Sequence, residues 1–291
     1  MVTLFYGAKP RYTVFMKKIC LFLLCFLTAC STVSREEYAH SIVSSAGLAE
    51  RKIVASPFIL TSFERVRFSG QEMHIYIEGD GLAWAGRSRP SLDPTPKNPV
   101  ALKLAAQDIA SNVVYLARPC QYSKLVNEEG RCPQKYWTSH RFAPEVIESY
   151  DAALNDIKKR YDVTFFHLVG FSGGANVAAL LAARRYDIAS LRSVAGNLDH
   201  VLLHQVHGVS QIPASLNAKD QAGAASHIPQ YHFIGGQDEI VPPSIVQSYI
   251  EAAGRRDCIY SAVIAGASHS KGWAERWPSL LQPSTTHPRL H

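Results

Sequence analysis

Beyond residue 30 the chain lacks any apolar run long enough to cross a bilayer, which excludes a membrane span in its main part. It also has no internal repeat, no CxxC pair and no H-E-x-x-H motif, so the sequence gives no support for a repeat array, a redox dithiol or a common zinc hydrolase. No basic run with interleaved aromatic residues is present. What remains is a chain of 291 residues, 47% hydrophobic and 19% charged, which is typical of one large globular domain or two small ones.

The N-terminal segment has the pattern of a secretory signal. Lys17 and Lys18 precede a short apolar run over 19–27, and small residues follow before Cys30. We expect residues 1–29 to be a signal peptide, which is most compact if translation starts at Met16. An uncleaved anchor helix is the alternative, although the apolar run is short for a bilayer.

The last residues of this segment, Leu-Thr-Ala-Cys, resemble a bacterial lipobox. That resemblance implies that Cys30 is lipidated and becomes the first residue, and Ser31 after it implies sorting to the outer membrane, facing the periplasm. Removing the four basic residues before Cys30 from a total of 30 leaves 26 basic against 24 acidic residues, a net charge of +2. The pI near 9.0 therefore gives little support for a nucleic-acid partner, and we expect none.

The remaining cysteines indicate one disulfide. Cys120 and Cys132 close a short loop, and in an oxidising compartment we expect them to pair. Their spacing disfavours a metal or redox site. Cys258 opens an apolar run and is expected to be a buried thiol.

Short apolar segments alternate with helical patterns along the chain. This order predicts an α/β protein with a mostly parallel central sheet and helices on both faces. We expect a tether over 30–56, one domain over 57–281 with a cap-like insertion at about 199–228, and a flexible tail over 282–291. The expected strands are 58–63, 74–77, 113–117, 164–169, 191–195, 231–234 and 259–264, and the expected helices are 98–110, 144–160, 175–184 and 243–252.

The strongest chemical signal is the sequence Gly-Phe-Ser-Gly-Gly over 170–174. It lies between an expected strand and an expected helix of small apolar residues. A tight strand-to-helix turn holds its central residue in a strained conformation and requires small neighbours. The hydroxyl of Ser172 would then project above the sheet edge at the positive end of a helix dipole, which suits a nucleophile. An ordinary glycine-rich turn is the alternative.

A serine hydroxyl needs a base within hydrogen-bond reach. Downstream, Asp238 follows one expected strand and His269 follows the next, so both lie at the same sheet edge as Ser172. We predict a Ser-His-Asp triad in which His269 exchanges the proton and Asp238 orients the imidazole. Glu239 and Asp199, which follows the preceding strand, are alternative acids.

Over residues 57–280 these features resemble the α/β-hydrolase superfamily, whose members hydrolyse esters, amides and related bonds. The resemblance implies an oxyanion hole made by the N–H of Gly173 and by an N–H of the loop that reads Glu-Gly-Asp-Gly over 78–81. By alignment that second donor is Asp80, with Gly79 or Gly81 if the register shifts by one. Relatives often have His at position 78, so this loop departs from the pattern, and an acidic loop can alternatively bind a cation.

Two further groups of residues have patterns that could indicate a site. His200, His204 and His207 have the spacing of one helix face, which metal sites use, but a polar face of the cap is the preferred interpretation and no metal is expected. Trp84 and Trp137 either line an acyl pocket or pack within their loops.

The sequence thus predicts a secreted, lipid-anchored serine hydrolase that needs no cofactor and acts on a small-molecule or lipid-like ester through an acyl-enzyme. Peptidase or acyltransferase chemistry on the same triad is the first alternative. The second is a catalytically silent α/β-hydrolase fold that binds a ligand at the envelope.

Overall fold

The computed structural model describes residues 1–4, 7, 33–86, 88–123 and 132–282. It divides into two units, Met1–Ser34 and Arg35–His291. The body of the predicted signal peptide, the predicted lipidation site Cys30 and the tail over 283–291 lie outside the described residues. Within the described ranges, no helix has both the length and the apolar character that crossing a membrane requires.

The larger unit is built on a sheet of eight strands in the order β1-β2-β4-β3-β5-β6-β7-β8. β1 and β2 pair antiparallel, and β2 is also antiparallel to β4, whereas the pairs from β4 to β8 are all parallel. The strands are β1 (Ala49–Ala55), β2 (Phe58–Val66), β3 (Met73–Ile77), β4 (Asn112–Leu116), β5 (Phe166–Phe171), β6 (Ile188–Val194), β7 (Gln230–Gly235) and β8 (Ile259–Ile264). The predicted fold class is confirmed.

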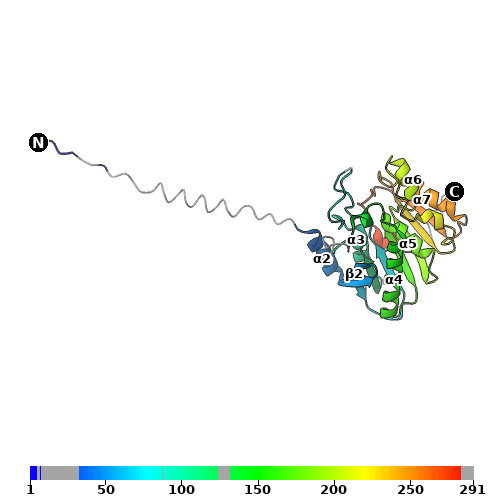
Figure 1. The fold of residues 1–291 in the computed structure, drawn as a ribbon. Helices are drawn as coiled ribbons and strands as arrows, with labels where there is room; N and C mark the ends of the chain where they lie inside the picture. Colours follow the sequence, from blue (N-terminus) through cyan, green and yellow to red (C-terminus); the bar gives the residue numbers. More distant parts are fainter. Residues whose placement is uncertain (5–6, 8–32, 87, 124–131, 283–291) are drawn as a thin grey trace. The chain divides into compact units, whose positions relative to one another are not determined.

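Helices cover both faces of this sheet (Figure 1). The core on one face contains the buried sides of α4 (Pro144–Tyr161), α5 (Gly173–Ala182) and α7 (Pro243–Ala253). The core on the other face contains residues of α2 (Arg35–Ala46), α3 (Val100–Gln107) and α8 (Trp277–Leu280). Successive side chains of β3 alternate between the two cores, with Ile75 and Ile77 in the first and Tyr76 in the second. Because both faces are covered, the strands are nearly continuous in apolar character.

The prediction of a tether over 30–56 is wrong for most of that range. Residues 35–46 form α2, which buries Ala39 and Val43 in the second core, and residues 49–55 form the edge strand β1. β1 pairs with β2 over its whole length, from Ala49 opposite Glu64 to Ala55 opposite Phe58. The compact unit therefore begins at Arg35, because the backbone of this segment completes the sheet although few of its side chains are buried.

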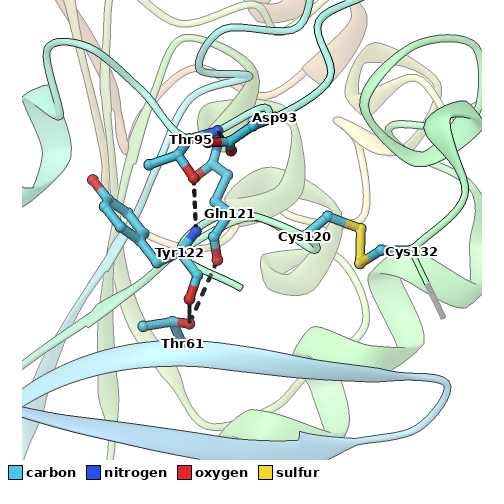
Figure 2. The surroundings of a disulfide bond; sticks show 7 residues. All are labelled: Thr61, Asp93, Thr95, Cys120, Gln121, Tyr122 and Cys132. Carbon is cyan, nitrogen blue, oxygen red and sulfur yellow. Dashed lines mark hydrogen bonds between the residues drawn. A yellow bond between two sulfur atoms is a disulfide. The ribbon is translucent and has the colours of Figure 1, made fainter. Parts of the chain in front are cut away.

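The other irregular segments hold short elements and one disulfide. The predicted cap contains α6 (His200–Val206) and the 3-10 turn η3 (Ala218–Gln221), and a second 3-10 turn, η2 (Gln134–Trp137), precedes α4. Cys120 and Cys132 form the predicted disulfide, with their Cα atoms 5.7 Å apart (Figure 2). Cys258 is a free thiol but is half-buried rather than buried.

Candidate active site

Ser172 lies in the turn between β5 and α5, in a backbone conformation with φ 50° and ψ −120°. A non-glycine residue at positive φ is strained and needs support from its surroundings. Its N–H donates to the carbonyl of Val194 on β6 at 3.0 Å. The neighbouring glycines permit the turn: a Cβ on Gly170 would lie 2.4 Å from Cα of Ala175, and one on Gly174 would lie 2.2 Å from the carbonyl oxygen of Ile77. The predicted elbow is therefore present, with little room for side chains around it.

The three predicted triad residues lie together. Nε2 of His269 is 3.0 Å from Oγ of Ser172, and Nδ1 of His269 is 2.9 Å from Oδ2 of Asp238. The serine follows β5, the aspartate follows β7 and the histidine follows β8, so the three come from the carboxyl ends of parallel strands. Both distances allow hydrogen bonds, and the chain of contacts can carry a proton away from the serine hydroxyl.

Asp238 is held as an anion. Its side chain is fully buried, and its Oδ1 accepts the N–H groups of Ile240 and Val241 at 2.8 and 2.9 Å. Burial alone raises the pKa of this carboxyl, but the hydrogen bonds from His269 and from Val241 outweigh it, and the pKa of Asp238 lies below its ordinary value. A buried carboxylate with three donors can orient an imidazole and stabilise its protonated form.

The alternative acids have other places. Asp199 is buried, caps α6 by accepting the N–H of Leu202 at 3.1 Å, and accepts the hydroxyl of Ser248 at 2.7 Å. Glu239 is exposed. Asp238 is therefore the acid that contacts His269.

The loop that carries His269 is fastened from two sides. The indole N–H of Trp273 donates to the carbonyls of Ser268 at 2.8 Å and of His269 at 3.1 Å, and this indole is buried in the second core. The N–H of Gln237 donates to the carbonyl of Ala267 at 2.8 Å, which ties the turn of Asp238 to the loop of His269. These contacts fix the imidazole relative to its acid. No sequence motif indicates this role of Trp273.

The predicted oxyanion donors lie on adjoining segments. A Cβ on Gly173 would lie 2.1 Å from Oδ1 of Asp80, so the loop after β3 passes directly beside the start of α5. In the described hydrogen bonds, the N–H groups of Gly173 and Asp80 have no protein acceptor. The N–H of Gly79, in contrast, donates to Oε1 of Glu78 at 2.9 Å. Of the three candidate donors on this loop, the N–H of Gly79 is thus occupied, whereas those of Asp80 and Gly81 have no protein acceptor in the described hydrogen bonds.

Comparisons with known proteins add evidence on the fold. No family model and no curated protein matches the chain. Solved structures do match: an esterase from Pyrococcus furiosus at TM-score 0.55 and 15% identity covers 80% of this chain and 88% of its own. An alpha-beta serine hydrolase homologue from Coxiella burnetii gives TM-score 0.51 and 19% identity over 80% of this chain and 93% of its own. A membrane phospholipase A described as a bacterial virulence factor gives TM-score 0.52 and 13% identity over 88% of this chain and 92% of its own.

The chain has the α/β-hydrolase fold. At these identities the comparison establishes the fold and leaves the chemistry to the site itself. In this fold the loop after β3 and the elbow after β5 face one another, which agrees with the contact between Asp80 and Gly173.

Two arginines that the sequence analysis missed contact the loop after β3. Nη1 of Arg118 is 3.0 Å from Oδ1 of Asp80, and Nη1 of Arg141 is 3.2 Å from its Oδ2. Both arginines stack on Phe142, with guanidinium carbons 5.0 and 5.7 Å from the ring centroid. Asp80 is therefore an ion-paired residue, and no sequence motif links three positions so far apart in the chain.

The histidines of the predicted cap face separate partners. Nε2 of His204 is 2.8 Å from Nη2 of Arg141, and burial together with this positive charge lowers the pKa of His204 to about 4. Nε2 of His207 is 2.7 Å from the carbonyl oxygen of Ile240. Among the described residues no group of three potential metal ligands comes together. Trp137 is buried in a small cluster with Ala83 and Cys120 and donates to the carbonyl of Ser91 at 3.1 Å, so it packs its own segment against the loop after β3. Trp84 is 44% exposed.

Proposed function

We propose that this protein is a serine hydrolase that cleaves an ester-like carbonyl through an acyl-enzyme. The observation that carries the proposal is the continuous chain of contacts from Oγ of Ser172 through the imidazole of His269 to the carboxylate of Asp238. Such an arrangement on a strained strand-to-helix turn activates a hydroxyl that is otherwise a poor nucleophile.

In the proposed reaction His269 accepts the proton of Ser172 while Oγ attacks the carbonyl carbon. The N–H groups of Gly173 and Asp80 donate to the resulting oxyanion, and Asp238 stabilises the imidazolium. The imidazolium then protonates the leaving alcohol, and the acyl group stays on Ser172. Water, deprotonated by His269, releases the acid and restores the hydroxyl.

An active-site fluorophosphonate probe tests the nucleophile. We expect it to label the wild type and Ser226→Ala, because the hydroxyl of Ser226 is exposed and, among the described residues, bonds only to the carbonyl of Gly223. Ser172→Ala and His269→Ala should not be labelled, provided that circular dichroism shows them folded. Equal labelling of the wild type and Ser172→Ala would overturn the proposal.

The choice of ester over amide or acyl transfer requires product analysis. The fold neighbours include an esterase and a membrane phospholipase A but also a proline iminopeptidase, so they are compatible with both ester and amide substrates. We propose an ester with a lipid-like acyl chain. A series of p-nitrophenyl esters of increasing chain length should give turnover that disappears in Ser172→Ala. Turnover of amides only, or transfer to added alcohols in preference to water, would replace this assignment. No turnover with a ligand retained through purification would favour a binding protein.

We further propose that the protein is anchored to the cell envelope through lipid on Cys30, outside the reducing cytosol. The lipobox-like sequence supports the anchor, and the Cys120–Cys132 disulfide supports the oxidising compartment. In a bacterial host, radioactive palmitate should be incorporated into the wild type and not into Cys30→Ser. Cys258→Ser is the control, because this free thiol lies in the folded unit. Equal incorporation in Cys30→Ser would refute the anchor.

A further inference from the structure

The carboxylate of Asp80 occupies a position that is electrostatically unfavourable for the proposed reaction. A Cβ built on Gly173 would lie 2.1 Å from Oδ1 of Asp80. This oxygen therefore lies beside Gly173, which supplies one of the two N–H groups assigned to the oxyanion. A negative charge at this place repels the negative charge that develops on the substrate oxygen, and the repulsion is strong in a partly buried site. The residue that supplies a donor through its backbone therefore opposes the reaction through its side chain.

Arg118 and Arg141 compensate this charge. Each contacts a different oxygen of Asp80, at 3.0 and 3.2 Å, and their side chains are only 5% and 13% exposed. Two buried guanidinium groups on one carboxylate leave the local charge positive rather than negative. Arg118 also donates through Nη2 to the carbonyl of Arg141, which links the two arginines to one another.

Arg118 precedes and Arg141 follows the loop that the Cys120–Cys132 disulfide closes. Gln121, next to the disulfide, donates through Nε2 to the carbonyl of Gly79 at 3.1 Å and accepts the N–H of Arg118 at 3.1 Å. Tyr122, two residues after Cys120, is also held by a hydrogen bond: its N–H donates to Oγ1 of Thr95 at 2.9 Å (Figure 2). The segment thus contacts the loop after β3 at both its backbone and its acidic side chain.

We propose that Arg118 and Arg141 are positioning residues for the oxyanion hole, an inference that rests on the proposed function. They hold the carboxylate of Asp80 so that its backbone N–H stays open toward the substrate oxygen, and they cancel the charge that this carboxylate would otherwise place beside the oxyanion. Gln121 holds the same loop through Gly79. The acidic side chain of Asp80 is tolerated beside the oxyanion donors because of these partners.

The test is a double-mutant cycle between Arg141 and Asp80, measured as kcat and KM on a p-nitrophenyl ester. We expect Arg141→Met to lower kcat about 10- to 100-fold with KM changed by less than about threefold, since the interaction acts on the transition state. Arg141→Lys should recover part of the loss because it restores a positive charge. In an Asp80→Asn background, adding Arg141→Met should cost less than about threefold, because no carboxylate remains to be neutralised.

Arg185→Met is the matched control. Arg185 is 9% exposed, pairs with Asp151 and Asp187, and stacks on Phe166 at 5.7 Å, but it lies beyond the far end of α5 from Ser172. It should leave kcat unchanged. Amide hydrogen exchange of the peptide that contains Asp80 should be faster in Arg141→Met and unchanged in Arg185→Met, with folding checked by thermal unfolding.

The outcomes separate the two proposals. An unchanged kcat in Arg141→Met, or an equal loss in the Asp80→Asn background, overturns the positioning role and leaves the serine-hydrolase proposal standing. A wild type without any turnover that depends on Ser172 overturns the proposed function, and the oxyanion role of these arginines with it.

Discussion

Replacing Asp238 by asparagine changes one group in the triad while keeping its shape. The carboxylate accepts three N–H groups, from His269 at 2.9 Å, Ile240 at 2.8 Å and Val241 at 2.9 Å. An asparagine oxygen can retain the two backbone donors, which places its NH₂ group against Nδ1 of His269. The imidazole must then carry its proton on Nε2, where it faces Oγ of Ser172 at 3.0 Å and cannot accept a proton.

We expect Asp238→Asn to lower kcat about 10⁴-fold, the size of effect seen when a triad histidine is held in the wrong tautomer. This corresponds to about 5.5 kcal/mol of transition-state stabilisation. The assay is ester hydrolysis at pH 7 to 8, with the protein shown to be folded and with KM measured separately. Glu239→Gln, the exposed neighbouring acid, is the control and should retain full activity. An Asp238→Asn variant within about tenfold of the wild type would refute the tautomer argument and reopen the assignment of the acid.

Three further predictions concern stability. Burial raises the pKa of Glu78 to about 7, so the folded protein keeps this proton at pH values where the unfolded chain has lost it, and the free energy of unfolding should fall by about 3 kcal/mol as pH rises from about 4.5 to 7. Urea unfolding of Glu78→Gln should lack this pH-dependent component, and an identical pH slope in the variant would contradict the prediction. Gly174→Ala places a Cβ 2.2 Å from the carbonyl oxygen of Ile77 and should lower the free energy of unfolding by more than about 4 kcal/mol or prevent folding. The control Gly223→Ala, whose Cβ has nothing within 4 Å, should leave the melting temperature nearly unchanged, and equal melting temperatures of the two variants would contradict the prediction. Opening the disulfide with Cys132→Ser frees a loop with sequence separation 12 and should cost about 3 kcal/mol in chemical denaturation, and a cost near zero would show that the unfolded chain is already restrained there.

The parts of the site that could be predicted are those with a local sequence signature. Ser172 lies between glycines that the turn requires, and Asp238 and His269 each end an apolar strand, so their positions at one sheet edge follow from the order of elements. Arg118 and Arg141 could not be predicted, because they lie 38 and 61 positions after Asp80 in the sequence and their importance depends on the fold that brings them to it. Ion pairs of this kind have no spacing rule in a sequence.

The fold was predictable from the sequence where strands are buried on both faces, and the prediction was wrong at one edge of the sheet. β1 buries only Ile53 and Ala55, and its first four residues are exposed, so its sequence looks like that of a solvated linker. It is a strand because the open edge of β2 offers hydrogen-bond partners along seven residue pairs. Backbone pairing at a sheet edge leaves little trace in the pattern of side chains, which is why the domain boundary was placed too late.

β8, the strand that delivers His269, lies at the end of the sheet and pairs only with β7 in the described part of the chain. Ser172, in contrast, follows a central strand flanked by β3 and β6. Outer strands open at a lower free-energy cost than inner ones. Gentle heating should therefore separate the base from its nucleophile while the remaining sheet is still folded, so that inactivation precedes the cooperative loss of structure.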